Sequence, residues 1–254
     1  MSGYGSFAYY YDRLTQNISY RKRAEYFNKL AEIHGGKKNI LLDLACGTGS
    51  LSEEFCRMGY DVIAVDGSEE MLNEALDKKF ESGLNIQYLC QDMTELDMFG
   101  TIDVTVCALD SLNHLPDLDA VRKTIERVSL FCETGGLFIF DVNTPYKHRN
   151  VLGNNTFVYD IEDVYCVWQN TYSEKDNRVE MSLDFFERLE NGDYKRYEES
   201  FSEIAFDDEV TEKILVDSGF EIVGKYDYDT FNPSREDSEK IVYVAKELLP
   251  KSLN

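Results

Sequence analysis

A short motif near the start of the chain places an acidic residue and two glycines directly after an apolar run. The run over 39–42 is typical of a buried strand, and Asp43, Gly47 and Gly49 follow it. Glycine lets the backbone turn tightly and approach a ligand without a Cβ in the way. A helical stretch over 50–57 comes next. A strand, a glycine-rich turn and a helix N-terminus together predict a nucleotide-binding corner at the carboxyl edge of a parallel sheet.

A second acidic residue, Asp66, ends the next apolar run, 19 residues after Gly47. A carboxylate at this distance is placed to accept hydrogen bonds from the two hydroxyls of a ribose. The dinucleotide fingerprint G-x-G-x-x-G is incomplete, because Ser52 stands where the third glycine belongs, and Asp43 is foreign to that fingerprint. An NAD-dependent oxidoreductase is therefore an alternative that the motif disfavours.

Composition narrows the classes of partner. The formal net charge of −22 argues against a bare nucleic acid as substrate, because phosphate binding depends on Lys and Arg, although a local basic groove stays possible. No apolar run approaches the roughly 18 residues that a membrane helix needs. We expect no signal peptide, since the N-terminus has neither a basic region nor an apolar core. Six cysteines without C-x-x-C spacing indicate reduced, buried thiols in a cytoplasmic protein.

Strands and helices alternate through the first half of the chain. We expect strands over 39–44, 61–66, 85–90, 102–108 and 136–142, and helices over 20–34, 50–57, 69–81 and 117–132. Apolar strands joined by helices through short loops predict a doubly wound parallel sheet in an α/β fold.

The pattern of apolar residues changes after Asn143. Residues 156–206 alternate with period two, so that Val179, Met181, Leu183 and Phe185 face one way, and turn signals fall at 174–177 and 190–193. This pattern predicts an antiparallel meander of three or four strands. A helix over 207–218 and strands over 220–228 and 240–246 complete the chain. We therefore divide it into a core over 1–143 and 204–254 and a β insertion over 144–203, which we expect to be either a substrate lid or a dimer contact.

Five segments in order extend the pattern to the whole core. They are Leu42 to Gly49 with the acid Asp66, then Gln91-Asp92-Met93, then Ala108 to Leu115, then Gly135-Gly136 before the fifth strand, and finally Asp217-Ser218-Gly219-Phe220. Together they resemble the class I S-adenosylmethionine-dependent methyltransferases. The resemblance implies a Rossmann-like, seven-stranded sheet, mostly parallel with a reversed last strand. It implies methyl transfer to an N or O nucleophile, with a small-molecule acceptor favoured. A protein or RNA acceptor, and a non-catalytic S-adenosylmethionine-binding module, are the alternatives.

The resemblance also implies a site for S-adenosylmethionine. Its residues are Tyr20, Asp43, Ala45, Gly47, Thr48, Gly49, Asp66, Gly67, Ser68, Met71, Gln91, Asp92, Met93 and Leu109. Gly47 and Gly49 would admit the methionine portion, and Asp66 would hold the ribose. Asp92 would accept from the adenine amino group, unless it is only a helix cap or a loop acid. Met71 would form part of an adenine wall or of the core.

Candidate catalytic residues follow the fourth strand. His114 could act as a general base with Asp110 beside it, because the unperturbed pKa of histidine lies near neutrality, or it could merely hydrogen-bond a loop. Tyr11 and Trp168 are candidates for contact with the acceptor, with core packing as the alternative. His34 and His148 are expected at the surface.

We expect no metal. Asp110, Asp141 and Asn143 are similar to the magnesium ligands of catechol-type methyltransferases, but a valine separates Asp141 from Asn143 and should turn one of them to the wrong face.

Overall fold

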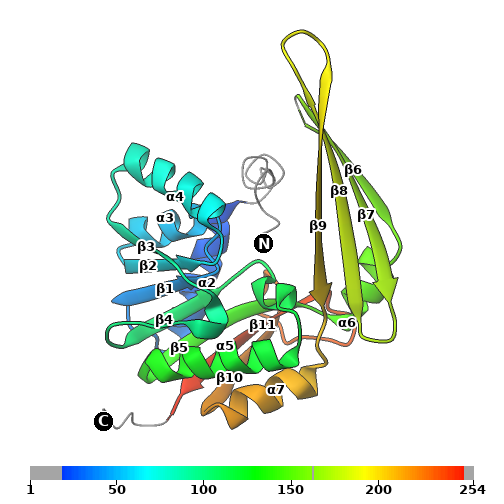
Figure 1. The fold of residues 1–254 in the computed structure, drawn as a ribbon. Helices are drawn as coiled ribbons and strands as arrows, with labels where there is room; N and C mark the ends of the chain where they lie inside the picture. Colours follow the sequence, from blue (N-terminus) through cyan, green and yellow to red (C-terminus); the bar gives the residue numbers. More distant parts are fainter. Residues whose placement is uncertain (1–18, 162, 249–254) are drawn as a thin grey trace.

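Two β-sheets organise the chain in the computed structural model, which describes residues 19–161 and 163–248 (Figure 1). The larger sheet has seven strands in the order β10-β11-β5-β4-β1-β2-β3. These are β1 (Ile40–Leu44), β2 (Asp61–Asp66), β3 (Ile86–Cys90), β4 (Ile102–Cys107), β5 (Cys132–Asn143), β10 (Phe220–Asp227) and β11 (Lys240–Glu247). Strands β1 to β5 pair in parallel, whereas β11 is antiparallel to both β5 and β10. The predicted Rossmann-like sheet with a reversed last strand is confirmed.

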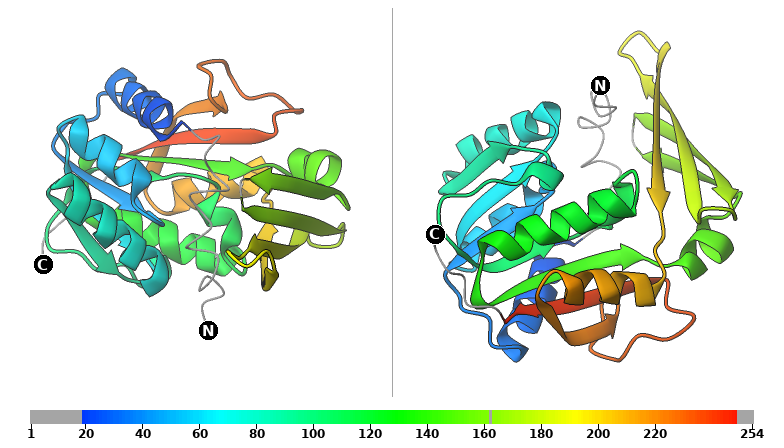
Figure 2. Two further views of the ribbon diagram at one scale, coloured as in Figure 1. Left: turned by 90° about the horizontal axis from the view of Figure 1, so that it is seen from above. Right: turned by 60° about the horizontal axis from the view of Figure 1, so that its bottom comes forward.

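Both faces of this sheet are covered, because its central strands are apolar on both sides. In β5, Phe138 and Phe140 lie in one apolar cluster, and Leu137 and Ile139 lie in another. Successive side chains of a strand point to opposite faces, so the two clusters are the two cores of a doubly wound domain. Helices α5 (Leu118–Phe131) and α7 (Asp208–Asp217) contribute to the first core, and α2 (Tyr20–Ile33) and α3 (Ser50–Arg57) to the second. Figure 2 shows helices on either side of the sheet.

The helix following β2 begins and ends where its sequence indicates. Helix α4 spans Glu69–Ser82, and the hydroxyl of Ser68 accepts a hydrogen bond from the backbone N–H of Met71 at 3.2 Å. Gly83, in the left-handed conformation, ends the helix. Ser68 is therefore the N-cap, which leaves the Asp66 carboxylate to other partners.

The second sheet is an antiparallel meander in the order β6-β7-β8-β9. Its strands are β6 (Thr156–Ile161), β7 (Val164–Ser173), β8 (Arg178–Arg188) and β9 (Tyr194–Ile204). The alternating side chains of β8 that were predicted to share a face are at most 1% exposed. Helix α6 (Pro145–Lys147) and the helical turn η3 (His148–Leu152) connect β5 to this sheet, which rises beside the core in Figures 1 and 2.

The cysteines follow the expectation in part. All six are free thiols, and Cys46, Cys107, Cys132 and Cys166 are buried, whereas Cys90 is exposed. Within the described ranges, no helix is long and apolar enough to cross a membrane.

The packing around Gly49 requires a residue without a Cβ. It precedes α3 with a φ of 74°, and a Cβ at this position would collide with the Tyr88 hydroxyl and lie 3.0 Å from the Cβ of Ala75. Gly49 is thus required where α3, α4 and β3 meet.

We predict that Gly49→Ala lowers the free energy of unfolding by about 2–4 kcal/mol, since it adds a left-handed strain to a steric overlap. Urea denaturation measures the change. Gly83→Ala is the matched control, because Gly83 has a φ of 68° but nothing within 4 Å of the added Cβ. It should cost only about 1–2 kcal/mol, from the strain alone. Equal losses in the two variants would contradict the packing argument.

Candidate functional site

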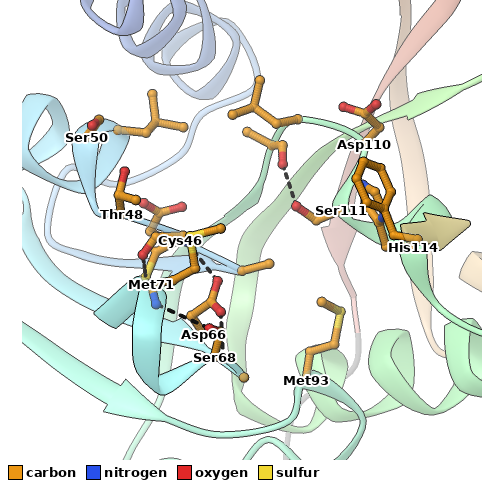
Figure 3. A pocket seen from close by; sticks show the side chains of 18 of the residues that line it. Cys46, Thr48, Ser50, Asp66, Ser68, Met71, Met93, Asp110, Ser111 and His114 are labelled. Carbon is orange, nitrogen blue, oxygen red and sulfur yellow. Dashed lines mark hydrogen bonds between the residues drawn. The ribbon is translucent and has the colours of Figure 1, made fainter. Parts of the chain in front are cut away.

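A cavity of about 560 Å³ lies at the carboxyl ends of the parallel strands, where the second sheet meets the core. Most predicted site residues line it: Tyr20, Asp43, Ala45, Gly47, Thr48, Asp66, Gly67, Ser68, Met71, Asp92, Met93, Leu109, Asp110, His114 and Trp168. Figure 3 shows Asp66 and Met71 on one side of the cavity and Asp110 and His114 on the other. The strand ends of a doubly wound sheet thus bring together side chains that are far apart in the sequence.

Two of the predicted residues that the structure describes, Gly49 and Gln91, are not part of this lining. Gly49 packs behind it against Tyr88. The side-chain amide of Gln91 accepts from the backbone N–H of Asp97 at 2.9 Å and donates to the carbonyl of the same residue at 3.1 Å. Gln91 therefore holds the loop after β3 in shape. Tyr11 lies outside the described residues.

Eleven further residues of the lining were not predicted: Arg23, Cys46, Ser50, Leu51, Ala108, Ser111, Leu115, Tyr159, Phe201, Glu203 and Lys240. Cys46 and Ser50 lie within the glycine motif and could have been included on that ground. Glu203 and Lys240 come from β9 and β11, and no local pattern marks either of them.

Asp66 anchors one end of the cavity. Its carboxylate accepts from the backbone N–H of Gly47 at 2.7 Å and from that of Ser68 at 2.9 Å, one on each oxygen. A carboxylate has about four acceptor positions, and because the N–H of Gly67 also interacts with it, at least one position remains for a ligand. Burial raises the pKa of Asp66, and the N–H groups of Ser68, Gly47 and Gly67 partly offset that rise. The site can therefore accept from a sugar diol.

Gly47 leaves room beside Asp66. It has a φ of 54°, and a Cβ added there would meet nothing within 4 Å. Ala45 also has a positive φ, of 60°. The backbone after β1 therefore turns in a conformation that residues other than glycine rarely adopt. The space at Gly47, the acceptor positions of Asp66 and the buried Asp43 fit S-adenosylmethionine, which presents a ribose, an ammonium and a carboxylate.

Asp43 is a buried acid behind the glycine turn. It is 2% exposed, and the hydroxyl of Ser52 donates to its Oδ2. Burial raises the pKa of Asp43 to about 7; the hydrogen bond from Ser52 opposes this rise, and the charge of Asp66 adds to it. The carboxyl group is thus prepared to ionise when a cation binds beside it.

Asp92 caps the helical turn over Met93–Glu95, which agrees with the alternative interpretation of this residue as a helix cap. Its Oδ1 accepts from both the backbone N–H and the hydroxyl of Thr94, each at 2.8 Å. Both bonds go to the same oxygen, and no described residue donates to Oδ2. The capping role therefore leaves one oxygen for a ligand such as the adenine amino group.

The other end of the cavity is built on a turn after β4. Leu109 and Asp110 have φ values of 62° and 56°. Their backbone N–H groups donate to the buried carboxylate of Asp141 at 2.7 and 3.2 Å. Two consecutive residues in this conformation cost free energy, and the hydrogen bonds that their N–H groups donate to Asp141 hold them there.

Lys240 neutralises this turn. Its ammonium lies 2.9 Å from Asp110 Oδ1 and 3.1 Å from Asp141 Oδ2. Burial alone would raise the pKa of Asp110, but Lys240 and Lys147 outweigh burial and hold that pKa well below its usual range. Burial likewise would lower the pKa of Lys240, and the two carboxylates raise it instead. Asp110 and Lys240 are therefore charged together.

Asn143 belongs to the same cluster, which corrects one step of the sequence argument. Its side-chain amide donates to Asp110 Oδ2 at 2.5 Å, so Asp141 and Asn143 both face Asp110. The intervening valine does not turn either of them away, because residues two apart in a strand share a face. The charge between the two carboxylates is the ammonium of Lys240.

His148 is buried, so the prediction that it lies at the surface is wrong. It is 0% exposed, its Nδ1 lies 2.9 Å from the carbonyl of Asn177, and its Nε2 lies 3.2 Å from Glu203 Oε2. The helical turn after α6 places His148 against Glu203 of β9. This contact depends on the tertiary fold. His34 is half-buried, with its Nε2 2.8 Å from the hydroxyl of Tyr226.

The comparisons agree with this geometry. A family model described as a methyltransferase domain matches residues 41–136. A protein of Geobacillus sp. (strain WCH70) named as a methyltransferase is 32% identical over 246 residues, which cover 96% of this chain and 99% of that one. The crystal structure of an S-adenosylmethionine-dependent methyltransferase from Clostridium acetobutylicum superposes with a TM-score of 0.87 at 36% identity and covers 98% of this chain and 100% of that one. The chain belongs to the class I S-adenosylmethionine-dependent methyltransferases.

A third relative is similar over a shorter stretch. The ubiquinone biosynthesis O-methyltransferase of Xanthomonas euvesicatoria is 33% identical over 126 residues, which are 48% of this chain and 50% of that one. This match covers too little of either chain to fix the acceptor of the present methyltransferase.

We predict a pH-dependent stability that originates at Asp43. Because its folded pKa of about 7 lies above the ordinary aspartate value of 3.8, the neutral acid stabilises the fold at low pH, and this stability is lost as pH rises towards 7. The methyltransferase without S-adenosylmethionine should lose about 2–3 kcal/mol between about pH 5 and about pH 8 from this group. Urea titrations of wild type and Asp43→Asn at both pH values measure the difference. Parallel pH dependence in the two proteins would contradict the prediction.

We predict that Lys240→Met lowers the free energy of unfolding by about 3–5 kcal/mol, because it leaves two buried carboxylates without their counter-charge. Lys213→Met is the control, since Lys213 is 72% exposed in a surface pair with Asp217. Its loss should not exceed about 1 kcal/mol. Similar losses in the two variants would show that the cluster contributes no more than a surface pair.

Proposed function

We propose that the enzyme transfers the methyl group of S-adenosylmethionine to a nitrogen or oxygen nucleophile of a small molecule. One observation carries the proposal: a single cavity is lined by the ribose-type acid Asp66 and also by Trp168 and Glu203 of the second sheet. Its volume of about 560 Å³ lies in the range of small-molecule sites. A methyl donor and a small acceptor can meet in it, shielded by both sheets.

The residues on the donor side of the site bind and orient S-adenosylmethionine. Bound S-adenosylmethionine supplies a methyl carbon that its positively charged sulfur already activates. Asp66 accepts from the ribose hydroxyls, and the turn at Gly47 accommodates the amino-acid portion. Asp92 accepts from the adenine amino group. These contacts fix where the methyl carbon lies relative to the acceptor, and alignment is the main requirement of this transfer.

His114 is the proposed general base. Its ring lines the cavity next to Asp110, and its side chain is 29% exposed. An acceptor hydroxyl, or an amine that binds protonated, must lose a proton, and an unprotonated imidazole nitrogen can accept it. Asp110 is held ionised by Lys240 and acts as a fixed charge near this imidazole.

Two further features support a small acceptor in the cytoplasm. The net charge of −22 disfavours a nucleic acid, and a partial relative acts in ubiquinone biosynthesis as an O-methyltransferase. Free thiols, four of them buried, fit the reducing cytoplasm. We propose that residues 144–203 form a lid unit on the core, since the acceptor side of the cavity draws Tyr159, Trp168, Phe201 and Glu203 from this segment.

Two variants test the two halves of the proposal. Asp66→Ala should weaken S-adenosylmethionine binding at least about tenfold, because it removes charge-assisted hydrogen bonds to the ribose. His114→Asn should keep that affinity and lose turnover with any accepted substrate. Calorimetry measures donor binding, and release of S-adenosylhomocysteine from a panel of small amines and alcohols measures turnover. Unchanged affinity in Asp66→Ala would refute the donor site, and wild-type turnover in His114→Asn would exclude it as the base.

A further inference from the structure

We propose that the acceptor is an aliphatic amine, bound as its ammonium beside Glu203 and His114 against the aromatic face of the second sheet. The inference rests on the proposed function and narrows its nitrogen-or-oxygen choice to nitrogen. Four observations carry it: a carboxylate oxygen open to the cavity, the lack of a permanent counter-charge for that carboxylate, two facing acceptor atoms, and a row of aromatic rings.

Glu203 presents one prepared oxygen to the cavity. Its side chain is 5% exposed and lines the cavity. Oε2 accepts from the amide of Asn143 at 2.7 Å and lies 3.2 Å from His148 Nε2. No described residue donates a hydrogen bond to Oε1. This oxygen is not fully buried, so a ligand in the cavity can reach it. Asn143 and His148 thus fix the carboxylate, and its second oxygen faces the space that an acceptor would enter.

The charges around Glu203 do not cancel. The buried cluster holds the carboxylates of Asp110, Asp141 and Glu203 but only the ammonium groups of Lys240 and Lys147. Lys240 contacts Asp110 and Asp141, and Lys147 donates to Asn143 Oδ1 at 2.8 Å. Among the described residues no lysine or arginine pairs with Glu203, whose ionisable neighbours within 4 Å are the imidazoles of His114 and His148, so this carboxylate has no permanent counter-charge at the cavity wall. A cation compensates it, whereas a neutral alcohol does not.

Among the described residues the cavity lining contains one more permanent cation, Arg23, which lies on α2 with its guanidinium 5.1 Å from the centre of the Tyr228 ring. Its contact is with an aromatic face on the core side, and no ion pair joins it to Glu203. It therefore leaves the charge of Glu203 uncompensated.

Two acceptor atoms face each other at this point. Glu203 Oε1 and His114 Nε2 are 3.7 Å apart, too far for a hydrogen bond between them. A nitrogen with two or three hydrogens can donate to both atoms from a position beside the pair, at hydrogen-bonding distance from each, but a hydroxyl has one hydrogen and can donate to only one. His114 Nδ1 has no hydrogen-bond partner among the described residues, so its ring can carry its proton on either nitrogen.

Aromatic rings continue from His114 along the inner face of the sheet. The centroid distances are 5.4 Å from His114 to Phe201, 6.1 Å from Phe201 to Trp168 and 6.2 Å from Trp168 to Tyr159. The indole N–H of Trp168 donates to Asn170 Oδ1 at 2.7 Å, which fixes the ring. Aromatic faces attract cations and pack against alkyl groups, so this row suits the carbon skeleton of an alkylammonium ion.

The chemistry balances with an amine. The bound ammonium first gives one proton to His114, which frees the nitrogen lone pair. That nitrogen then forms a bond to the methyl carbon while the carbon–sulfur bond breaks, and the bonding electron pair stays on sulfur. The products are the N-methylated ammonium ion and neutral S-adenosylhomocysteine, and His114 returns its proton to solvent.

Calorimetry with matched probes tests the inference. Phenethylamine and 2-phenylethanol, and cyclohexylamine and cyclohexanol, are titrated at neutral pH into the enzyme saturated with S-adenosylhomocysteine. We expect each amine to bind at least about tenfold more tightly than its alcohol, because only the amine carries the charge that Glu203 complements. Glu203→Gln should reduce this preference to about threefold or less and leave the affinity for S-adenosylhomocysteine unchanged.

Glu198→Gln is the matched control. Glu198 lies on the same strand but on its other side, it is 67% exposed, and it pairs with Arg196. The control should keep the full preference for amines. Equal affinity of amine and alcohol in the wild-type enzyme, or no binding of either, would overturn the inference even if S-adenosylhomocysteine binds. Failure of S-adenosylhomocysteine to bind would instead overturn the proposed function. The wild-type comparison decides the matter even if Glu203→Gln does not fold.

Discussion

The contact of Lys240 with Asp110 and Asp141 is the constraint on which one end of the cavity depends. Two carboxylates at neighbouring strand ends would repel each other without a cation between them. With Lys240 in place, Asp141 can accept from the two N–H groups of the turn after β4, which keeps Leu109 and Asp110 in an unfavourable conformation. This turn determines where η2 (Ser111–His114) begins and therefore where His114 lies.

The same cluster joins the two sheets. Asn143 ends β5, and its amide contacts both Asp110 of the core and Glu203 of β9. The core thereby fixes one edge of the second sheet through hydrogen bonds to a charged group, which are stronger than neutral ones. His148, from the connection between the sheets, completes the contact at Glu203. This end of the cavity is thus a product of both sheets.

The Asp66 end of the cavity is built differently, from local backbone geometry. Asp66 holds the turn at Gly47 through one hydrogen bond and the start of α4 through another. All of these residues lie within one strand–turn–helix unit and the strand beside it. Because local geometry carries this end of the cavity, its residues could be predicted from spacing, whereas Gly49 and Gln91 turned out to support the fold around it.

Sequence alone determined the sheet, the helix limits and most of the residues that line the Asp66 end of the cavity, because alternation, glycine and capping residues act on neighbours in the chain. It also indicated the β insertion, whose β8 alternates as the pattern predicted. Only the tertiary structure decided that Lys240, Glu203 and His148 meet at one end of the cavity. These residues lie in three elements separated by long stretches of chain, and nothing local distinguishes a lysine or glutamate that will be buried from one that remains at the surface. Their burial follows from how the two sheets pack.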